Sequence, residues 1–239
     1  MSKAEPIVTE PVRQAAAGAA QAPRGHLTEA AYRHVKSLIL DGRVKPGERL
    51  DVNHIIAKLT TSRQPVMTAL RRLAGEGFVD ITPQSGCRVS LPNRHTIGDF
   101  FRAFAAIEGV SAEIAAERAA PDTLPKLIDI NEKIGELGRQ HSLSAAKRGE
   151  RYRRLNQRFH RYIHDMGRSG LISVLSESFW DKADFYIAST LGLSPFATRI
   201  DTSYQEHQEI ISAIRLRRGD EARRLMEAHI RAFASTTDH

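Results

Sequence analysis

Cysteine is almost absent from this chain, which has a single thiol, Cys87, among its 239 residues. One cysteine cannot form an intrachain disulfide and cannot supply a cysteine-rich zinc site by itself. Long apolar runs are missing as well, because no segment approaches the roughly 20 residues that a membrane-spanning helix needs. We therefore expect a cytoplasmic protein in a reducing environment, with no membrane span.

The first 25 residues also lack the continuous apolar core of a secretory signal. They are rich in alanine, proline and glutamine instead, as in MSKAEPIVTEPVRQAAAGAAQAPRG. This composition cannot bury enough apolar surface to fold. Residues 1–25 are predicted to be a disordered leader.

Positive charge is concentrated in one block of the sequence. The chain has a formal net charge of +7, and residues 24–95 carry 12 basic and 6 acidic side chains, whereas residues 96–239 carry 21 and 20. A basic module joined to a nearly neutral one is what phosphate neutralisation by one domain requires. Charge alone leaves an acidic membrane surface or a merely solvated basic face as alternatives.

The pattern of residues 26–92 indicates three helices followed by a β-hairpin. Apolar positions at helical spacing occur in LTEAAYRHVKSLIL, DVNHIIAKL and PVMTALRRLA, and two short β-like runs, FVDI and CRVSL, follow. This order is that of a winged helix-turn-helix domain. Such a domain inserts the N-terminal end of its third helix into the major groove of DNA.

That end of the third helix is Ser62-Arg63-Gln64. A hydroxyl group suits a phosphate, a guanidinium can contact guanine through two hydrogen bonds, and an amide can contact adenine. We therefore predict that Arg63 reads bases. An ordinary solvated helix end is the alternative.

The pattern after the predicted linker, residues 93–96, is helical to the end of the chain. Glycine and proline divide it into six stretches, at about 97–119, 123–139, 146–166, 171–190, 200–218 and 220–234. Short connections between helices favour an antiparallel arrangement. Residues 97–235 are predicted to form an all-α antiparallel bundle, so that the chain as a whole is mainly α.

Four polar residues of the predicted bundle have the chemistry of metal ligands. Asn156 and His160 are four residues apart and share one helix face, and His207 and His229 fall in the last two helices. Imidazoles with an oxygen ligand suit zinc, nickel, manganese or iron. Packed or surface histidines are the alternative, since spacing alone does not separate the two.

The N-terminal module resembles the winged-helix domain of the GntR family. The resemblance is carried by "DGRVKPGERL", "SRQPV", "ALRRLAGEGFV" and a glycine-bearing wing, in this order. It implies that a dimer binds double-stranded operator DNA. The residues that we expect at the DNA are Arg49, Ser62, Arg63, Gln64, Arg71, Gly86 and Arg88. Met67-Thr68 stands where the family usually has an arginine and an acid, so one DNA contact is missing.

The helical part resembles the C-terminal domain of FadR-type GntR regulators, in its shorter, VanR-like six-helix form. The motifs that carry this resemblance are "AIEGVSAEIAAERA", "NQRFH" and "EHQEIISAIRLRRGDEARRLMEAHI". It implies a divalent metal held by Asn156, His160, His207 and His229, with asparagine in place of the commoner aspartate. His164 lies one turn beyond His160 and is expected behind the ligands or at the surface.

A second departure concerns the effector. Relatives often carry an arginine for an effector carboxylate where this chain has Phe104, within Phe104-Ala105-Ala106-Ile107-Glu108. The effector is then less acidic, binds through the metal, or uses another cation such as Arg102. The predicted effector-binding residues are Arg102, Phe104, Asn156, His160, His207 and His229.

These observations predict a metabolite-responsive transcriptional regulator, most simply a repressor, that acts as a homodimer and responds to a small organic acid. One alternative is a structural DNA-binding protein without a ligand. The other is a metal-dependent enzyme, against which stands the lack of a general-base motif, a phosphate loop and a nucleophile elbow. We therefore expect no enzymatic activity.

Overall fold

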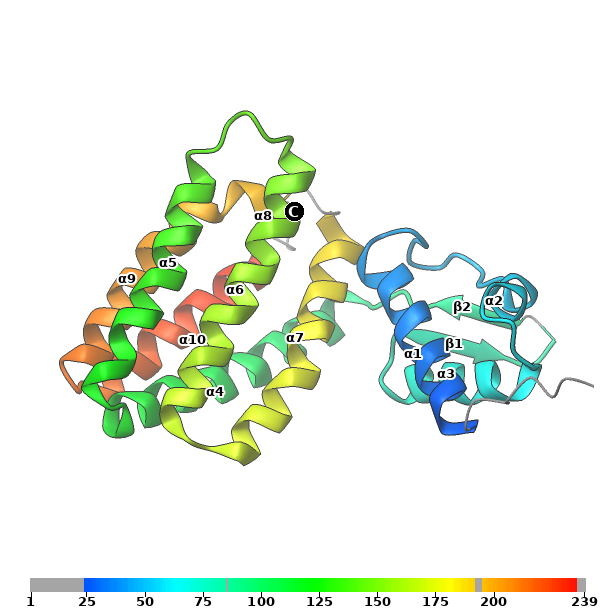
Figure 1. Ribbon diagram of the computed structural model, residues 1–239, viewed down its shortest axis with the longest axis horizontal. Helices are drawn as coiled ribbons and strands as arrows, with labels where there is room; N and C mark the ends of the chain where they lie inside the picture. The colour runs from blue at the N-terminus through cyan, green and yellow to red at the C-terminus, as the bar shows by residue number, and fades with distance from the viewer. Residues whose placement is uncertain (1–23, 85, 192–194, 236–239) are drawn as a thin grey trace, which may run out of the picture.

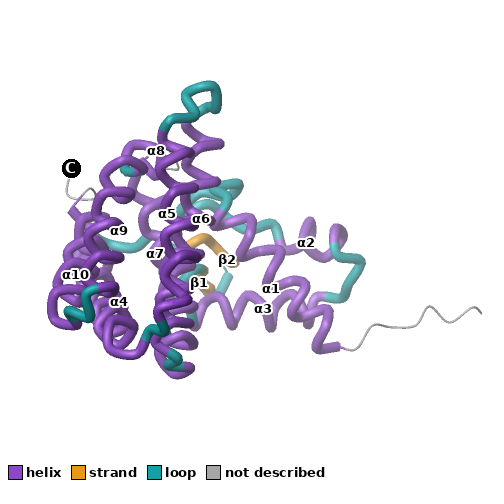
Figure 2. Tube along the Cα trace, turned by 60° about the vertical axis from the view of Figure 1, so that its left-hand side comes forward, coloured by secondary structure: helices purple, strands orange, loops and turns teal. Residues whose placement is uncertain are grey.

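The computed structural model describes residues 24–84, 86–191 and 195–235. Within these ranges the chain forms two parts joined by one short connection (Figure 1). The first part combines three helices with a small sheet, and the second is built from helices (Figure 2). The predicted fold class, a winged helix-turn-helix followed by an all-α bundle, is confirmed.

The first part is the predicted helix-turn-helix with its wing. Its elements are α1 (Arg24–Leu40), α2 (Val52–Lys58), α3 (Arg63–Gly75), β1 (Val79–Thr82) and β2 (Gly86–Val89). The strands pair in antiparallel register from Val79 opposite Val89 to Thr82 opposite Gly86. This two-stranded sheet is the wing.

Helix α3 is positioned by one apolar face. Val66, Ala69, Leu70 and Leu73 recur at helical spacing and are fully buried, which leaves the opposite face of α3 exposed. Helix α2 begins where the side chain of Asp51 accepts a hydrogen bond from the backbone N–H of His54 at 3.0 Å. The buried face therefore fixes which side chains of α3 remain available to DNA.

The second part contains the six predicted long helices and one additional short helix, α8. Its elements are α4 (Arg94–Arg118), the 3₁₀ turn η1 (Pro121–Thr123), α5 (Leu124–Gly138), α6 (Ala145–Gly167), α7 (Gly170–Leu191), α8 (Pro195–Thr198), α9 (Ile200–Arg215) and α10 (Gly219–Ser235). Helix α4 packs on α6 and α10, and α5 packs on α6 and α9. Among the described helices, none has the length and apolar character to span a membrane.

Two predicted boundaries differ from the structure. Helix α1 already begins at Arg24, inside the predicted leader, whose residues 1–23 lie outside the described ranges. Helix α4 begins at Arg94, because the side chain of Asn93 accepts a hydrogen bond from the backbone N–H of Thr96 at 2.8 Å and caps it. The predicted linker, residues 93–96, is therefore helical over its last three residues.

Helix α7 connects the two parts, as its position beside α1 in Figure 1 indicates. The ammonium group of Lys182 donates to the backbone carbonyls of Glu76, at 2.7 Å, and of Gly77, just after α3. Asp181 forms an ion pair with Lys36 of α1 at 2.7 Å. These contacts tie α7 to α1 and to the residues that follow α3.

Candidate DNA-binding face and metal centre

The N-terminal end of α3 presents three exposed polar side chains, Ser62, Arg63 and Gln64, beside the buried Pro65. Ser62 occupies the N-cap position, but its hydroxyl makes no capping hydrogen bond. The first backbone N–H groups of a helix lack partners within the helix and favour an anion. This end of α3 can therefore take a DNA phosphate while Arg63 reaches a base.

Arg63 shares a concave surface of about 640 Å³ with Arg49, Met67 and the wing residue Gly86. Gly86 has a φ of +85°, and a Cβ at this position would lie 3.3 Å from Nη2 of Arg49. The left-handed backbone conformation favours glycine, whereas the flexible end of Arg49 can shift to make room for a Cβ. The structure thus brings three of the predicted DNA-binding residues, Arg49, Arg63 and Gly86, to one face beside Met67.

The remaining arginines of the module differ in their partners. Arg71 and Arg88 are exposed, although Nη1 of Arg88 also donates to the carbonyl of Gly47 at 3.2 Å. Arg72 instead forms ion pairs with Glu29 and Glu76. We therefore attribute a structural role to Arg72 and retain Arg71 and Arg88 as candidates for phosphate contacts.

Three histidines from three helices meet in the interior of the bundle. His160 lies on α6, His207 on α9 and His229 on α10, and none is more than 1% exposed. Nε2 of His229 lies 3.3 Å from Nε2 of His160 and 3.2 Å from Nε2 of His207. Two nitrogens that each bind one zinc ion at about 2.0–2.1 Å are separated by roughly 3.3 Å in tetrahedral geometry. The spacing fits ligands of one ion.

The other ring nitrogen of each histidine, Nδ1, faces an oxygen atom. The pairs are His160 with Glu108 at 2.9 Å, His207 with Asn131 at 3.1 Å, and His229 with Glu206 at 2.6 Å. Ionised carboxylates and amide oxygens only accept hydrogen bonds, so each Nδ1 carries the proton and donates. Each Nε2 is then left with a lone pair.

The three Nε2 atoms lie together in a buried space. When all three rings are neutral, no donor lies between their lone pairs, which is costly in a buried site, and a cation removes that cost. Burial lowers the pKa of His160 to about 4 and also lowers that of His207, so these two rings are neutral near pH 7. Neutral imidazoles whose Nδ1 donates to an oxygen are typical metal ligands. The donor set therefore fits a divalent metal.

Glu108 of α4 joins several polar groups behind His160. It is fully buried and accepts hydrogen bonds from His160, from Nε2 of His164 at 3.0 Å, and from the hydroxyl of Ser176 on α7. Burial alone raises the pKa of a carboxyl group, but the two histidine hydrogen bonds outweigh it and hold the pKa of Glu108 well below its usual range. The structure thus places His164 behind His160, next to Glu108.

Asn156 precedes His160 by one turn of α6 and is also buried. Its Oδ1 lies 3.2 Å from the hydroxyl of Tyr152. Beside it is an inner cavity of about 10 Å³, which holds about one water molecule. The inner cavity is lined by Phe101, Phe104, Arg153, Asn156, Trp180, Ala183, Asp184, Ile187, Phe196, Ile230 and Phe233.

The two predicted effector residues of α4 lie on different sides of the helix. Phe104 lines the inner cavity, whereas Arg102 is exposed. Residues two positions apart in an α-helix point about 200° apart around its axis, so Arg102 and Phe104 cannot both face the same cavity. The expectation that Arg102 binds an effector there is corrected.

Sequence reasoning missed the oxygen partners of the histidines: Glu108, Asn131 and Glu206. Glu108 carried one usable signal, because it follows Phe104 by four residues and therefore shares its apolar helix face. A lone acid at such a position needs a buried partner. The partner could not be chosen from the sequence, because His160 lies 52 positions away.

A winged helix-turn-helix joined to a helical part with a buried polar centre indicates the class of protein: a DNA-binding regulator with a helical sensor part. Residues 27–89 match the model of the gntR family of bacterial regulatory proteins, and residues 99–232 match that of the FCD domain. The chain belongs to the GntR family of transcriptional regulators and carries an FCD domain. The family resemblance seen in the sequence is confirmed.

Curated relatives extend over most of the chain. The HTH-type transcriptional regulator YdhC of Bacillus subtilis is 23% identical and aligns with 83% of this chain and 85% of its own length. The Nta operon transcriptional regulator of Aminobacter aminovorans is 27% identical over 78% of this chain and 82% of its own. The repressor GlaR of Escherichia coli is 23% identical, over 83% and 90%. The chain is accordingly a transcriptional regulator and not an enzyme.

Solved structures show the same fold. McbR/YncC of Escherichia coli has a TM-score of 0.67 at 18% identity and covers 88% of this chain and 96% of its own. A GntR regulator from Rhodococcus sp. RHA1 also has a TM-score of 0.67 at 18% identity, over 89% and 97%. At these identities the likeness extends to the fold alone.

Proposed function

We propose that this regulator is a metal-dependent repressor whose affinity for a palindromic operator is changed by a small organic acid bound in the FCD domain. The observation that carries the metal-linked part is the convergence of three buried Nε2 lone pairs from His160, His207 and His229. The name of the relative GlaR, a transcriptional repressor, supports repression here.

His160, His207 and His229 would hold the metal, with Asn156 as the oxygen ligand. These four side chains carry no formal charge, so a bound zinc, nickel, manganese or iron ion keeps its positive charge and attracts an anionic oxygen ligand. The Nδ1 hydrogen bonds fix the orientation of the rings before any ion binds. Asn156 and Phe104 line the cavity where an effector would reach the centre.

Operator binding would require two copies of the chain. Each copy presents one α3, and a two-fold dimer matches a palindromic site with half-sites about one helical turn apart or closer. In each half-site we assign base reading to Arg63, with Ser62 and Gln64 beside it. Arg49, Arg71 and Arg88 would contact phosphates, and Gly86 would bring the wing close to the minor groove.

Helix α7 offers the route from the sensor to the DNA-binding face. The ring centroids of Trp180 and His160 are 4.4 Å apart, and Ser176 donates to Glu108. Lys182 follows Trp180 by two residues on α7 and donates to the backbone carbonyl groups of Glu76 and Gly77, just after α3. An effector changes operator affinity only if it binds more tightly to the protein with α7 in one position than to the protein with α7 in another.

Elemental analysis of protein purified without a His-tag tests the metal-linked function. We expect about one divalent ion per wild-type chain and its loss in both His160→Ala and His207→Ala, while His141→Ala, at an exposed position, retains it. Nickel titration of metal-free protein should quench Trp180, the single tryptophan. A wild-type protein that contains no ion and binds neither zinc, nickel nor manganese refutes the proposal.

The proposed assembly has its own measurement. Sedimentation of the full chain, free and on DNA fragments selected by the purified protein, should give a dimer bound to an inverted repeat. A monomer in both states contradicts the dimeric model. Genes that lie beside the selected fragments would identify the regulated pathway and, through it, the chemical class of the effector.

A further inference from the structure

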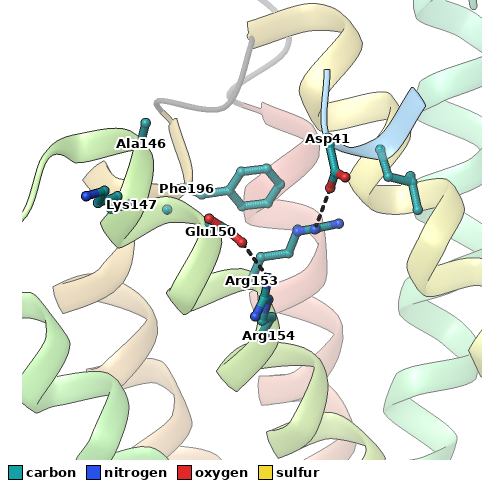
Figure 3. A pocket seen from close by; sticks show the side chains of 9 residues that line it. Asp41, Ala146, Lys147, Glu150, Arg153, Arg154 and Phe196 are labelled. Carbon is teal, nitrogen blue, oxygen red and sulfur yellow. Dashed lines mark hydrogen bonds and ion pairs between the residues drawn. The ribbon is translucent and has the colours of Figure 1, made fainter. Parts of the chain in front are cut away.

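The face where the two parts of the molecule meet contains an outer cleft of about 280 Å³ between the end of α1 and the first turns of α6 (Figure 3). Asp41, Lys147, Glu150, Arg154 and Phe196 are among its lining residues. We propose that this outer cleft admits the effector and that Arg153, at the boundary with the inner cavity, binds its carboxylate group. The proposal rests on the proposed function, because it names the ligand chemistry of that sensor.

The first observation is that Arg153 and Phe196 line both the outer cleft and the inner cavity. Arg153 precedes Asn156 by three residues, so the two side chains share one face of α6. The inner cavity holds about one water molecule at its volume of about 10 Å³. A small metabolite must therefore displace the side chains at this boundary to approach Asn156.

The second observation is the present bonding of Arg153, whose side chain is 16% exposed. Its Nη1 lies 3.2 Å from Oδ2 of Asp184. Its Nη2 lies 3.6 Å from Oδ1 of Asp41, as the dashed line in Figure 3 marks. A guanidinium fork matches a carboxylate through two parallel hydrogen bonds. Arg153 instead divides its two ends between the carboxyl groups of Asp184 and Asp41, and a ligand carboxylate can replace either.

The third observation is an unused donor at the same place. Trp180 lines the inner cavity, and its buried indole N–H has no hydrogen-bond partner within the part of the chain that the structure describes. Indole is a donor only, so its partner must be an acceptor such as a carboxylate oxygen. Arg153 and Trp180 together therefore favour an anionic oxygen ligand over a cationic or purely apolar one.

This placement also explains how binding would reach the DNA-binding module. Asp41 directly follows α1, whereas Arg153 and Asp184 belong to the bundle. A carboxylate on Arg153 competes with Asp41 for the same guanidinium and so weakens one link between the two parts. Because Asp41 is half exposed, at 47%, this link is weak and a ligand carboxylate can replace it.

The test uses the fluorescence of Trp180 in the full chain, titrated with acetate, lactate and succinate, with neutral lactamide as the uncharged probe. At least one carboxylate should change the emission, with a midpoint at least tenfold lower in wild type than in Arg153→Gln. Arg153→Lys should be intermediate because it keeps the charge but not the fork. Arg158→Gln, an exposed arginine of the same helix, should match wild type.

A variant that gains affinity for the carboxylate distinguishes a role in binding from a loss caused by misfolding. Asp41→Asn removes a competing negative charge from an exposed position, so its carboxylate midpoint should fall two- to fivefold, which a folding defect cannot produce. Equal midpoints in wild type and Arg153→Gln overturn the proposal. So does the absence of any response to the three carboxylates, or an equal response to lactamide.

The zinc content is measured before each titration, and zinc-loaded and metal-free protein are both used. A wild-type chain that takes up no zinc refutes the metal-linked function, and Arg153 is then judged on the metal-free titrations alone. Full zinc occupancy with equal midpoints in wild type and Arg153→Gln refutes the role of Arg153 and leaves the metal centre intact.

Discussion

The DNA-binding face and the histidine centre use polar side chains in opposite ways. Ser62, Arg63 and Gln64 are exposed, and the fold does not depend on their side chains. His160 and its partner Glu108 are buried and bonded to one another. Substitutions on the DNA-binding face should therefore change DNA affinity with little effect on stability. Substitutions in the histidine centre should change both metal binding and stability.

The largest effect is therefore expected inside the bundle, for Glu108→Ala. The change leaves donors on His160, His164 and Ser176 without an acceptor, at a cost of about 3–5 kcal/mol in the free energy of unfolding. It also removes the hydrogen bond that orients the ring of His160, which we expect to weaken zinc binding about 10–100-fold. Urea denaturation and zinc titration measure the two effects.

Glu117→Ala is the matched control for Glu108→Ala, because Glu117 lies on the same helix and is exposed. It should leave stability within about 0.5 kcal/mol of wild type. A Glu108→Ala protein as stable as this control would show that the buried network contributes nothing, and the contrast between the two regions would fail.

The reverse pattern is expected for Arg63→Ala on the DNA-binding face. Loss of a base contact should cost about 1–3 kcal/mol of affinity for the selected operator and much less for random DNA. The melting temperature should hardly change. Arg33→Ala removes the same charge from an exposed position of α1, and fluorescence anisotropy on both DNAs compares the variants. Equal losses on both DNAs would assign Arg63 to phosphate.

The two regions also differ in how far the sequence predicts them. Helical spacing of Val66, Leu70 and Leu73 identifies the buried face of α3 and, by difference, the face left for DNA. Very short helices and helix ends are harder: the four-residue α8 is not predicted, and α4 begins earlier than predicted because Asn93 caps it. Periodicity reports apolar faces and carries little information on such ends.

The histidine centre was predictable only in part. Resemblance named His160, His207 and His229, and the structure brings them together, but their role as metal ligands stays a prediction. The prediction for Arg102 fails because Arg102 is exposed on a different face of α4 from Phe104. Arg153 gave no signal, because its partners Asp184 and Asp41 come from other helices and contact it only in the folded chain.

A pH-dependent effect is expected between the two regions, at Asp184 of α7. This carboxyl is buried and accepts hydrogen bonds from Arg153 and from Gln157, at 2.7 Å. Burial raises its pKa from an ordinary value of 3.8 to about 7, against the charge of Arg153 and together with the repulsion of Asp181. The folded state therefore holds a proton on Asp184 over a range of pH in which the unfolded chain has released it.

The sign of the pH dependence follows from that proton. The stabilising contribution is complete below about pH 4 and is lost as the pH rises through about 7, because the folded state binds more protons in between. Asp184→Asn cannot ionise, so its stability relative to wild type should increase between pH 5 and pH 8. Urea denaturation of both proteins at these two pH values isolates the effect, since all other titrating groups are shared. If wild type and Asp184→Asn differ in free energy of unfolding by the same amount at pH 5 and pH 8, the pKa of Asp184 is not raised into this range. Asp184 is then ionised throughout and forms a full ion pair with Arg153.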